Sequence, residues 1–309
     1  MSHTHRLKTT AASSWYTDIA KNWRSYVLLA PFMMIFLVFT VIPVFVTFAI
    51  SLTNYNVLEM PQWVGLENYK KLLFYDDVFQ QAVKNTLIFA LVTGPIGYML
   101  CFLATWAINS LNRLLKSVLT FVFYIPTISG TIYLIWSIIF SGDIYGYANS
   151  FLLRLGLVNE PIQWFTTDQY ILPLIIIVQL WMSMGTGFLA MRAGMASIDS
   201  QYYEAGAIEG IRNRAQELWY ITIPLMAPHL MTAAVLQVTA MFSNAAVAQQ
   251  LAGFPSTNYK GHLIMTHMMD YSTIRIERGY ASAIAVIMFV IILALNRLIL
   301  KLLSKVGDV

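Results

Sequence analysis

The stretch YVLLAPFMMIFLVFTVIPVFVTFAI, residues 26 to 50, runs for 25 residues without a charged side chain. A helix needs about 20 apolar residues to cross the hydrocarbon core of a bilayer. The stretch is about twice as long as the apolar region of a secretory signal peptide, and the SLTNYN that follows it has no small-residue cleavage pattern. We therefore expect it to remain in the mature chain as a membrane anchor.

Five further stretches have a similar character, at residues 86–109, 117–141, 171–191, 226–248 and 280–303. The composition agrees, because 58% of the 309 residues are hydrophobic and only 11% are charged. A soluble core of this size would not bury so much apolar surface. The sequence therefore predicts an all-α polytopic membrane protein with about six transmembrane helices. Its expected parts are a cytoplasmic N-terminal segment (1–25), a transmembrane domain (26–303) and a cytoplasmic tail (304–309).

The basic residues outside the spans predict the orientation, because they concentrate on the cytoplasmic side. With the N-terminus inside, 12 of the 19 lie in the cytoplasm: Arg6, Lys8, Lys21, Arg24, Arg113, Lys116, Arg192, Arg212, Arg214, Arg297, Lys301 and Lys305. We therefore expect a multi-pass membrane protein with both termini in the cytoplasm. The net charge of +4 is spread along the chain instead of forming one basic stripe, which argues against a nucleic-acid partner.

Several functional classes find no support in the residues. The single Cys101 excludes an internal disulfide and is expected either to face lipid or to pack between helices. His262 and His267 are too sparse for a metal site and are expected to be ordinary surface residues. Before Arg297 the span interiors contain no Asp, Glu, Lys or Arg, and ion-coupled secondary transporters usually keep such a group at the membrane midplane. No acid, base and metal-ligand groups converge as in a membrane enzyme.

The segment RAGMASIDSQYYEAGAIEGIRNRAQELWYITIP, residues 192 to 224, is too long for a simple turn between two spans. Asp199 or Ser200 is a suitable N-cap for a short helix, Gly210 can end that helix, and residues 213–219 have the composition of a second short helix. Glu204 and Ile208 would share one face at a spacing of four. The alternative is a solvated surface hairpin without a partner.

This segment resembles the cytoplasmic loop of the inner-membrane permeases of binding-protein-dependent ABC importers. The loop of that family has the form EAA, three residues, Gly, about nine residues, then I-x-L-P. The matching residues here are Glu204, Ala205, Gly206, Gly210, Ile221, Ile223 and Pro224. The chain departs from the pattern at Gly206 (usually Ala), at Ile223 (usually Leu) and in the spacing, because ten residues separate Gly210 from Ile221.

The resemblance implies that this loop is a coupling helix that docks into a groove on a separate ATPase subunit. Glu204, with Glu209 at the family's usual acidic position, would supply carboxylates, and the small residues Ala205 and Gly206 would permit close docking. No phosphate-binding GxxxxGK[ST] loop occurs in the chain, so ATP and Mg would be bound by the partner ATPase. The chain itself would be no enzyme and would bind no cofactor. The other implied partners are a second permease subunit, an extracytoplasmic substrate-binding protein and the lipid membrane.

Weaker patterns are similar to the larger, maltose-permease-like subunit of the carbohydrate-uptake branch, among them YIPTISGTIYLIWSIIF in the third span, LAGFPST at 251–257 and GYASA at 279–283. Phe254 stands where that subunit has a second glycine. A sugar or oligosaccharide is therefore the expected cargo. The alternatives are another neutral or polar solute, such as a glycerophosphodiester, and an ion-coupled secondary transporter.

Alignment with the maltose-type permease assigns the substrate pathway to eight positions: Gln179, Met182, Ser183, Thr186, Gln237, Ala240, Met241 and Asn244. Trp181 and Phe242 would add flat apolar surface for sugar rings. The alternative is that the same polar residues hydrogen-bond one helix to another. The outer segments 53–84 and 249–280 are long enough to contact a binding protein.

Overall fold

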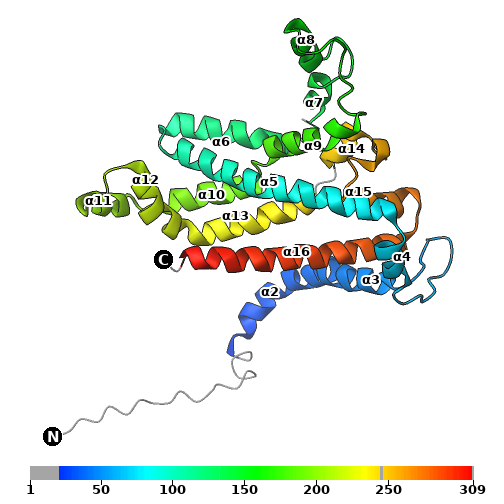
Figure 1. Ribbon diagram of the computed structural model, residues 1–309. Coiled ribbons are helices and arrows are strands. Elements are labelled where there is room, and N and C mark those ends of the chain that lie inside the picture. Colours follow the sequence, from blue (N-terminus) through cyan, green and yellow to red (C-terminus); the bar gives the residue numbers. More distant parts are fainter. Residues whose placement is uncertain (1–20, 132, 244–245, 308–309) are drawn as a thin grey trace.

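The computed structural model describes residues 21–131, 133–243 and 246–307, and in these ranges the chain is helical, with one isolated β-bridge between Thr53 and Trp63. Within them five helices are long and apolar enough to cross a membrane: Trp23–Ser51, Asp77–Asn109, Asp168–Ser197, Arg214–Ala252 and Arg278–Leu303. The predicted all-α polytopic fold is confirmed. Figure 1 shows these helices side by side, with α11 and α12 at one end of the bundle and α4 and α15 at the other.

The first predicted span consists of α2 (Trp23–Phe36), a π-helical turn (Leu37–Val41) and α3 (Ile42–Ser51). Pro43 lies in the first turn of α3, where its missing N–H interrupts the regular hydrogen bonding. The α3 helix packs against α16 (Arg278–Gly307), with the rings of Phe48 and Phe289 6.0 Å apart. In contrast, no residue of α2 is buried, and α2 bends away from the bundle (Figure 1).

The second predicted span is longer than expected, because α5 runs from Asp77 to Asn109. The side chain of Asp76 caps this helix by accepting a hydrogen bond from the Phe79 N–H at 2.8 Å.

The third predicted span, 117–141, was wrong as a single helix. It is divided into α6 (Arg113–Ile128) and α7 (Leu134–Ile139). Pro126 lacks the N–H that would continue the hydrogen bonding, and Ser129 takes an extended conformation. With 16 residues α6 spans about 24 Å, which is short of the roughly 30 Å hydrocarbon core.

The fourth predicted span is also interrupted, at residues 183–185, between α9 (Asp168–Met182) and α10 (Thr186–Ser197). The carbonyl groups left free by the break find donors on neighbouring helices. Thr127 Oγ1 donates to the Met184 oxygen at 3.2 Å, and the buried Cys101 thiol donates to the Ser183 oxygen at 3.4 Å. Such partners are necessary where irregular backbone lies at membrane depth. Of the two positions expected for Cys101, the structure shows the one between helices.

The last two spans are α13 (Ile223–Ser243), followed by α14 (Ala246–Ala252), and α16. The α13 helix lies at the centre, against α5, α10 and α16. Glycines allow the close approach. A Cβ added to Gly97 of α5 would lie 2.9 Å from Gln237 Nε2, and one added to Gly187 of α10 would lie 3.2 Å from Gln237 Oε1. Small residues at such contacts are typical of membrane helices.

Short elements cover the end of the bundle at which α5 begins: α4 (Glu67–Phe74), a 3₁₀ turn (Thr257–Tyr259), α15 (Ile264–Met269) and a π-helical turn (Asp270–Ile274). The α8 helix (Tyr147–Arg154) lies elsewhere. Outside the bundle, α7 and α8 form an arm (Figure 1). The buried Asn149 side chain organises this arm by donating to the backbone oxygens of Ser141, Asp143 and Ile162 and accepting from Trp164 Nε1.

Gly97→Val is expected to destabilise the bundle, because its side chain would collide with Gln237 and Ser183, whose nearest atoms lie 2.9 and 3.1 Å from the added Cβ. Overpacking of this kind costs about 1–3 kcal/mol. The measurement is thermal unfolding of the purified chain in detergent. Gly130→Val is the matched control, since nothing lies within 4 Å of its added Cβ. An equal loss in both variants would contradict the packing described for α13.

Candidate functional site

The predicted helix in the loop between the fourth and fifth spans is α11, Ser200–Ile208. Its start and end follow from local sequence. The Asp199 carboxylate accepts from the Gln201 N–H at 3.1 Å, and the helix ends in a Schellman motif, in which the Ile211 N–H donates to the Gly206 oxygen and the Gly210 N–H to the Ala207 oxygen. Gly210 has φ +99°, which other L-residues rarely adopt. The prediction that Gly210 ends this helix is confirmed.

The second predicted short helix is not separate. It starts as α12 (Arg214–Glu217), capped by Asn213, which accepts from the Gln216 N–H at 2.9 Å, and continues through a π-helical turn (Leu218–Thr222) into α13. Ile221 and Pro224 therefore lie in one helical rod that runs into the bundle. The predicted loop also begins too early, because its first residues, up to Ser197, belong to α10.

The inner face of α11 is fastened to this rod. Tyr203 and Thr222 hydrogen-bond through their hydroxyl groups at 3.0 Å, and Thr222 donates to the Glu217 oxygen at 3.2 Å. A Cβ added to Gly206 would lie 2.6 Å from Cδ1 of the buried Ile221. The departure from the family pattern at Gly206 therefore has a physical reason, because α11 packs so closely on Ile221 that an alanine there requires the isoleucine to shift.

The outer face of α11 has no contact with the rest of the described chain that would bury it. Glu204, Ala205 and Ala207 are exposed on it, and Ile208 is 88% exposed. Glu209, which follows the helix, is exposed as well. An isoleucine so exposed, one helical turn from a carboxylate and flanked by alanines, forms a small docking surface, which we call the α11 face.

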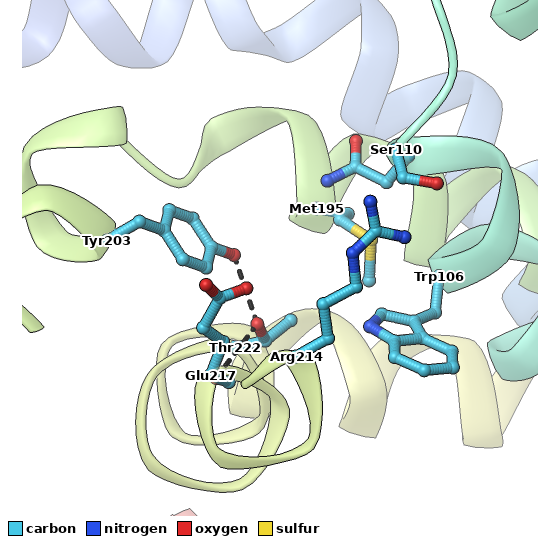
Figure 2. Close-up of a pocket in the computed structure, with 8 residues that line it drawn as sticks. Trp106, Ser110, Met195, Tyr203, Arg214, Glu217 and Thr222 are labelled. Atoms are coloured by element: carbon cyan, nitrogen blue, oxygen red, sulfur yellow. Dashed lines mark hydrogen bonds between the residues drawn. The ribbon is translucent and has the colours of Figure 1, made fainter. Parts of the chain in front are cut away.

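A polar cavity of about 250 Å³ lies between the inner side of this loop and the ends of α5 and α10 (Figure 2). Its lining residues are Trp106, Asn109, Ser110, Met195, Tyr203, Arg214, Glu217 and Thr222. Figure 2 shows the Arg214 side chain crossing the cavity beside Trp106 and Met195, toward Ser110 at the end of α5. The partial negative charge at the C-terminus of α5 favours the Arg214 guanidinium at this position. The loop therefore meets the bundle through the α12–α13 rod and a partly open polar space.

The predicted pathway residues lie around the break in the fourth span and on α13. Gln179 and Ser183 are buried on α9 and at its end, and Gln237 and Met241 are buried on α13. Met182 is half-buried, whereas Thr186 and Ala240 are exposed. Asn244 lies outside the described residues.

Burial divides these candidates. The four buried residues pack against other helices of the same chain. Gln237 and Ser183 lie against Gly97, Met241 lies against Gly94, and Met241 Sδ accepts from Thr93 Oγ1 at 3.3 Å. Burial alone does not decide their role, because Gln237 and Met241 also line a cavity of about 360 Å³ between α5, α13 and α16. Direct contact with a substrate stays a prediction for all four. The ring surface expected at Phe242 and Trp181 stays a prediction as well. The Phe242 side chain is 4% exposed and lines the same cavity, and Trp181 is 37% exposed.

One group of polar residues was missed by sequence reasoning. His262 and His267 are not surface residues but are 2% and 1% exposed, and they form a chain of hydrogen bonds with Asp76. The three residues are far apart in the sequence, so no spacing connects them. The sequence offered one indication of a special role, because His262 and His267 are the only histidines in the predicted outer segments 53–84 and 249–280.

Comparisons with known proteins agree with the architecture. Residues 97–307 match the family described as "Binding-protein-dependent transport system inner membrane component". The chain is 29% identical to the "Probable ABC transporter permease protein YesP" of Bacillus subtilis over 286 residues, covering 91% of this chain and 90% of the relative. It is 27% identical to the "Arabinooligosaccharides transport system permease protein AraP" of the same organism, covering 96% and 95%. It is 28% identical to the "Lactose transport system permease protein LacF" of Rhizobium radiobacter, covering 72% and 73%.

Among solved structures, the fold is similar to a chain of a bacterial alginate ABC transporter in complex with an alginate pentasaccharide-bound periplasmic protein. The TM-score is 0.76 at 20% identity, and the similarity covers 96% of this chain and 99% of the other.

Gly206→Leu is expected to loosen α11 from the rod, because its Cβ would lie 2.6 Å from Ile221 and 3.1 Å from Ile211. A destabilisation of about 1–3 kcal/mol is expected from such overpacking. Ala207→Leu is the matched control, because this neighbour is exposed on the same helix. Thermal unfolding and proteolysis within the loop measure both. If Ala207→Leu destabilises the loop as much as Gly206→Leu, the assignment of inner and outer faces is wrong.

Proposed function

The chain belongs to the family of binding-protein-dependent transport system inner membrane components, and on that premise we propose that it is one permease subunit of an ATP-driven importer of a sugar or oligosaccharide. The observation that carries the proposal is the α11 face, an exposed surface on a loop that is built into the helical rod of the bundle. The chain would form half of the translocation pathway, and ATP and Mg would be bound by a partner ATPase.

The construction of the loop supports a role in force transmission. The α11 helix is joined to the rod by the Tyr203–Thr222 hydrogen bond and by the contact of Gly206 with Ile221. A displacement of α11 would therefore be passed to α13, which touches α5, α10 and α16. Glu204 and Glu209 offer carboxylates for basic partners, and the alanines beside Glu204 allow close approach. An ATPase that grips the α11 face would thus act on most of the bundle through one rod.

A second permease subunit is supported by surfaces that the chain itself leaves open. Arg24 is the one charged residue of α2, and no residue of this helix is buried. Such an apolar surface needs to be covered by lipid or by another membrane subunit. The detachment of α2 from the bundle gives a second membrane subunit access to both of its sides (Figure 1).

The broken fourth span supports a pathway near the middle of the membrane. Discontinuous helices are typical of transport sites, because their free backbone groups can face a polar cavity. Thr186 follows the break and is exposed, and on α13 the exposed residues Leu236, Thr239 and Ala240 share one face. We propose that this face, with Thr186, lines the pathway. The uncharged character of the face suits a neutral solute, and the arabinooligosaccharide and lactose permeases among the relatives support a sugar.

The orientation follows from the same proposal. The α11 face would lie in the cytoplasm, where the ATPase is, together with both termini. The opposite end, with α4, α15 and residues 253–277, would face outward and receive an extracytoplasmic binding protein.

Glu204→Lys is expected to abolish at least about nine-tenths of binding-protein-stimulated ATP hydrolysis, because reversing a docked charge typically costs several kcal/mol. The measurement uses the chain expressed with its neighbouring permease, ATPase and binding-protein genes, followed by co-purification and an ATPase assay. Glu160→Lys, an exposed glutamate outside the loop, is the matched control for co-purification. Transport by the wild-type chain without any bound ATPase would refute the importer proposal.

Ala240→Trp is expected to block solute uptake while leaving ATPase assembly intact, since the indole would occupy the proposed pathway. Ala294→Trp makes the same change at an exposed position of α16 and is expected to leave uptake near the wild-type rate. Uptake of labelled sugar into proteoliposomes containing the full complex measures both. Equal uptake by the two variants would show that the pathway does not follow this face of α13.

A further inference from the structure

The end of the bundle opposite the α11 face contains a buried chain of titratable groups. His267 Nε2 lies 3.1 Å from Asp76 Oδ2, and His267 Nδ1 lies 3.2 Å from His262 Nε2. The same Asp76 oxygen accepts from the Tyr280 hydroxyl at 2.7 Å and from the Tyr271 hydroxyl at 3.5 Å. The other Asp76 oxygen caps α5. We call Asp76, His267 and His262 the latch.

The latch connects three parts of the chain. Asp76 precedes α5, Tyr280 belongs to α16, and the two histidines belong to the segment 253–277. Further bonds hold this segment to α5. Asn85 donates to the backbone oxygens of Tyr259 and His262, both at 2.9 Å, and Thr86 Oγ1 accepts from the Ile264 N–H at 2.9 Å. The position of the segment over the bundle therefore depends on groups that include an unusual buried histidine pair.

Counting protons shows how the pair responds to acid. Asp76 is an acceptor, so His267 donates through Nε2–H and its Nδ1 accepts from Nε2–H of a neutral His262. One added proton can be accommodated, with the proton on His267 Nδ1 and His262 turned to its other tautomer. A second proton places N–H against N–H at 3.2 Å between two cationic rings, which is repulsive. The chain of hydrogen bonds is thus compatible with at most one cation.

We propose that the latch positions the segment 253–277 on α5 and α16 and that protonation of both histidines from the outer side releases it. Asp76, His267 and His262 are positioning residues for this segment. The placement of the segment 253–277 on the outer side, where it would receive the binding protein, rests on the proposed function. The hydrogen bonds of the latch are independent of that proposal.

The charged groups around the latch do not offset the histidine repulsion. Asp270 and Arg275 pair at 2.8 Å, and Lys71 and Glu277 pair at 3.8 Å, so each of these charges has its own counterion. Arg275 also stacks on the Tyr271 ring at 4.4 Å. Tyr259 lies edge-on to His262 with ring centroids 5.4 Å apart and adds no charge. Asp76 remains as the anion that faces the histidines directly, and it contacts only His267 of the two.

The direction of the pH effect follows from burial. Desolvation, together with the charge of His267, lowers the pKa of His262 from its ordinary 6.5 to about 4. Because the pKa of His262 is lower in the latched state than in the released state, the released state binds protons more readily. His262 therefore stabilises the latched state fully above pH 6.5, and this stabilisation is lost as the pH falls toward 4. Although burial opposes it, hydrogen bonds from His267, Tyr280 and the Phe79 amide hold the pKa of Asp76 below its ordinary value, so Asp76 stays ionised while His262 titrates.

The first test is hydrogen–deuterium exchange of the full chain in lipid nanodiscs, with protection corrected for the pH dependence of intrinsic exchange. Protection of peptides from residues 254–275 is expected to fall about 30-fold between pH 7.5 and 5.0, as linkage through one histidine with the shifted pKa predicts. His262→Gln is expected to keep the protection at pH 7.5, because glutamine can still donate, and to lose most of the pH response. His229→Gln, a histidine on α13 outside the latch, is expected to retain the full response.

Protection that stays constant with pH in the wild type, or that falls equally in His262→Gln, would overturn the proposal. Asp76→Asn gives a second check, because it can keep the helix cap but removes the charge, and it is expected to reduce protection already at pH 7.5. A parallel assay compares binding-protein-stimulated ATP hydrolysis at outer pH 7.5 and 5.0 in the reconstituted complex. If the complex shows no stimulation at any pH, the proposed function fails while the exchange result still decides the latch.

Discussion

The close packing of α13 against three neighbouring helices is the contact on which the rest of the structure depends. Gln237 fits between Gly97 of α5 and Gly187 of α10, at separations that leave no room for a larger residue. In a lipid environment helices gain little from hydrophobic association, so tight contact and buried polar groups must hold them together. Since α13 continues into the α12 rod, the same packing connects the bundle with the α11 face.

The two ends of the bundle are fastened in different ways. At one end α11 is held by one hydroxyl pair and a glycine contact, beside a polar cavity that leaves space for the loop to shift. At the other end the latch, Asn85 and Thr86 bind the segment 253–277 by buried hydrogen bonds. Buried polar bonds are costly to break while they are fully paired, and they fail when one partner changes its charge. Under the proposed function, movement imposed at the α11 face would reach an opposite end that buried hydrogen bonds hold together.

Burial also affects the role that can be assigned to the polar residues of the spans. Gln179, Ser183 and Gln237 have the composition expected of a sugar pathway, and each is buried against neighbouring helices of the same chain, although Gln237 also lines a cavity. Thr186 and Ala240 have small side chains with few or no hydrogen-bonding groups, but they are exposed. The same side chains serve helix packing and solute contact equally well, so only their direction separates the two roles.

The sequence by itself determined the helical membrane fold, the approximate positions of the apolar segments, a short helix that begins at Asp199 or Ser200 and its end at Gly210. These features depend on local hydrophobicity, capping and backbone conformation, which neighbouring residues control. The tertiary structure alone decided the break after α6, the side of α11 that faces Ile221, the direction of the pathway candidates and the burial of His262 and His267. Each of these depends on contacts between residues far apart in the chain, such as Asp76 with His267, for which sequence spacing carries no signal.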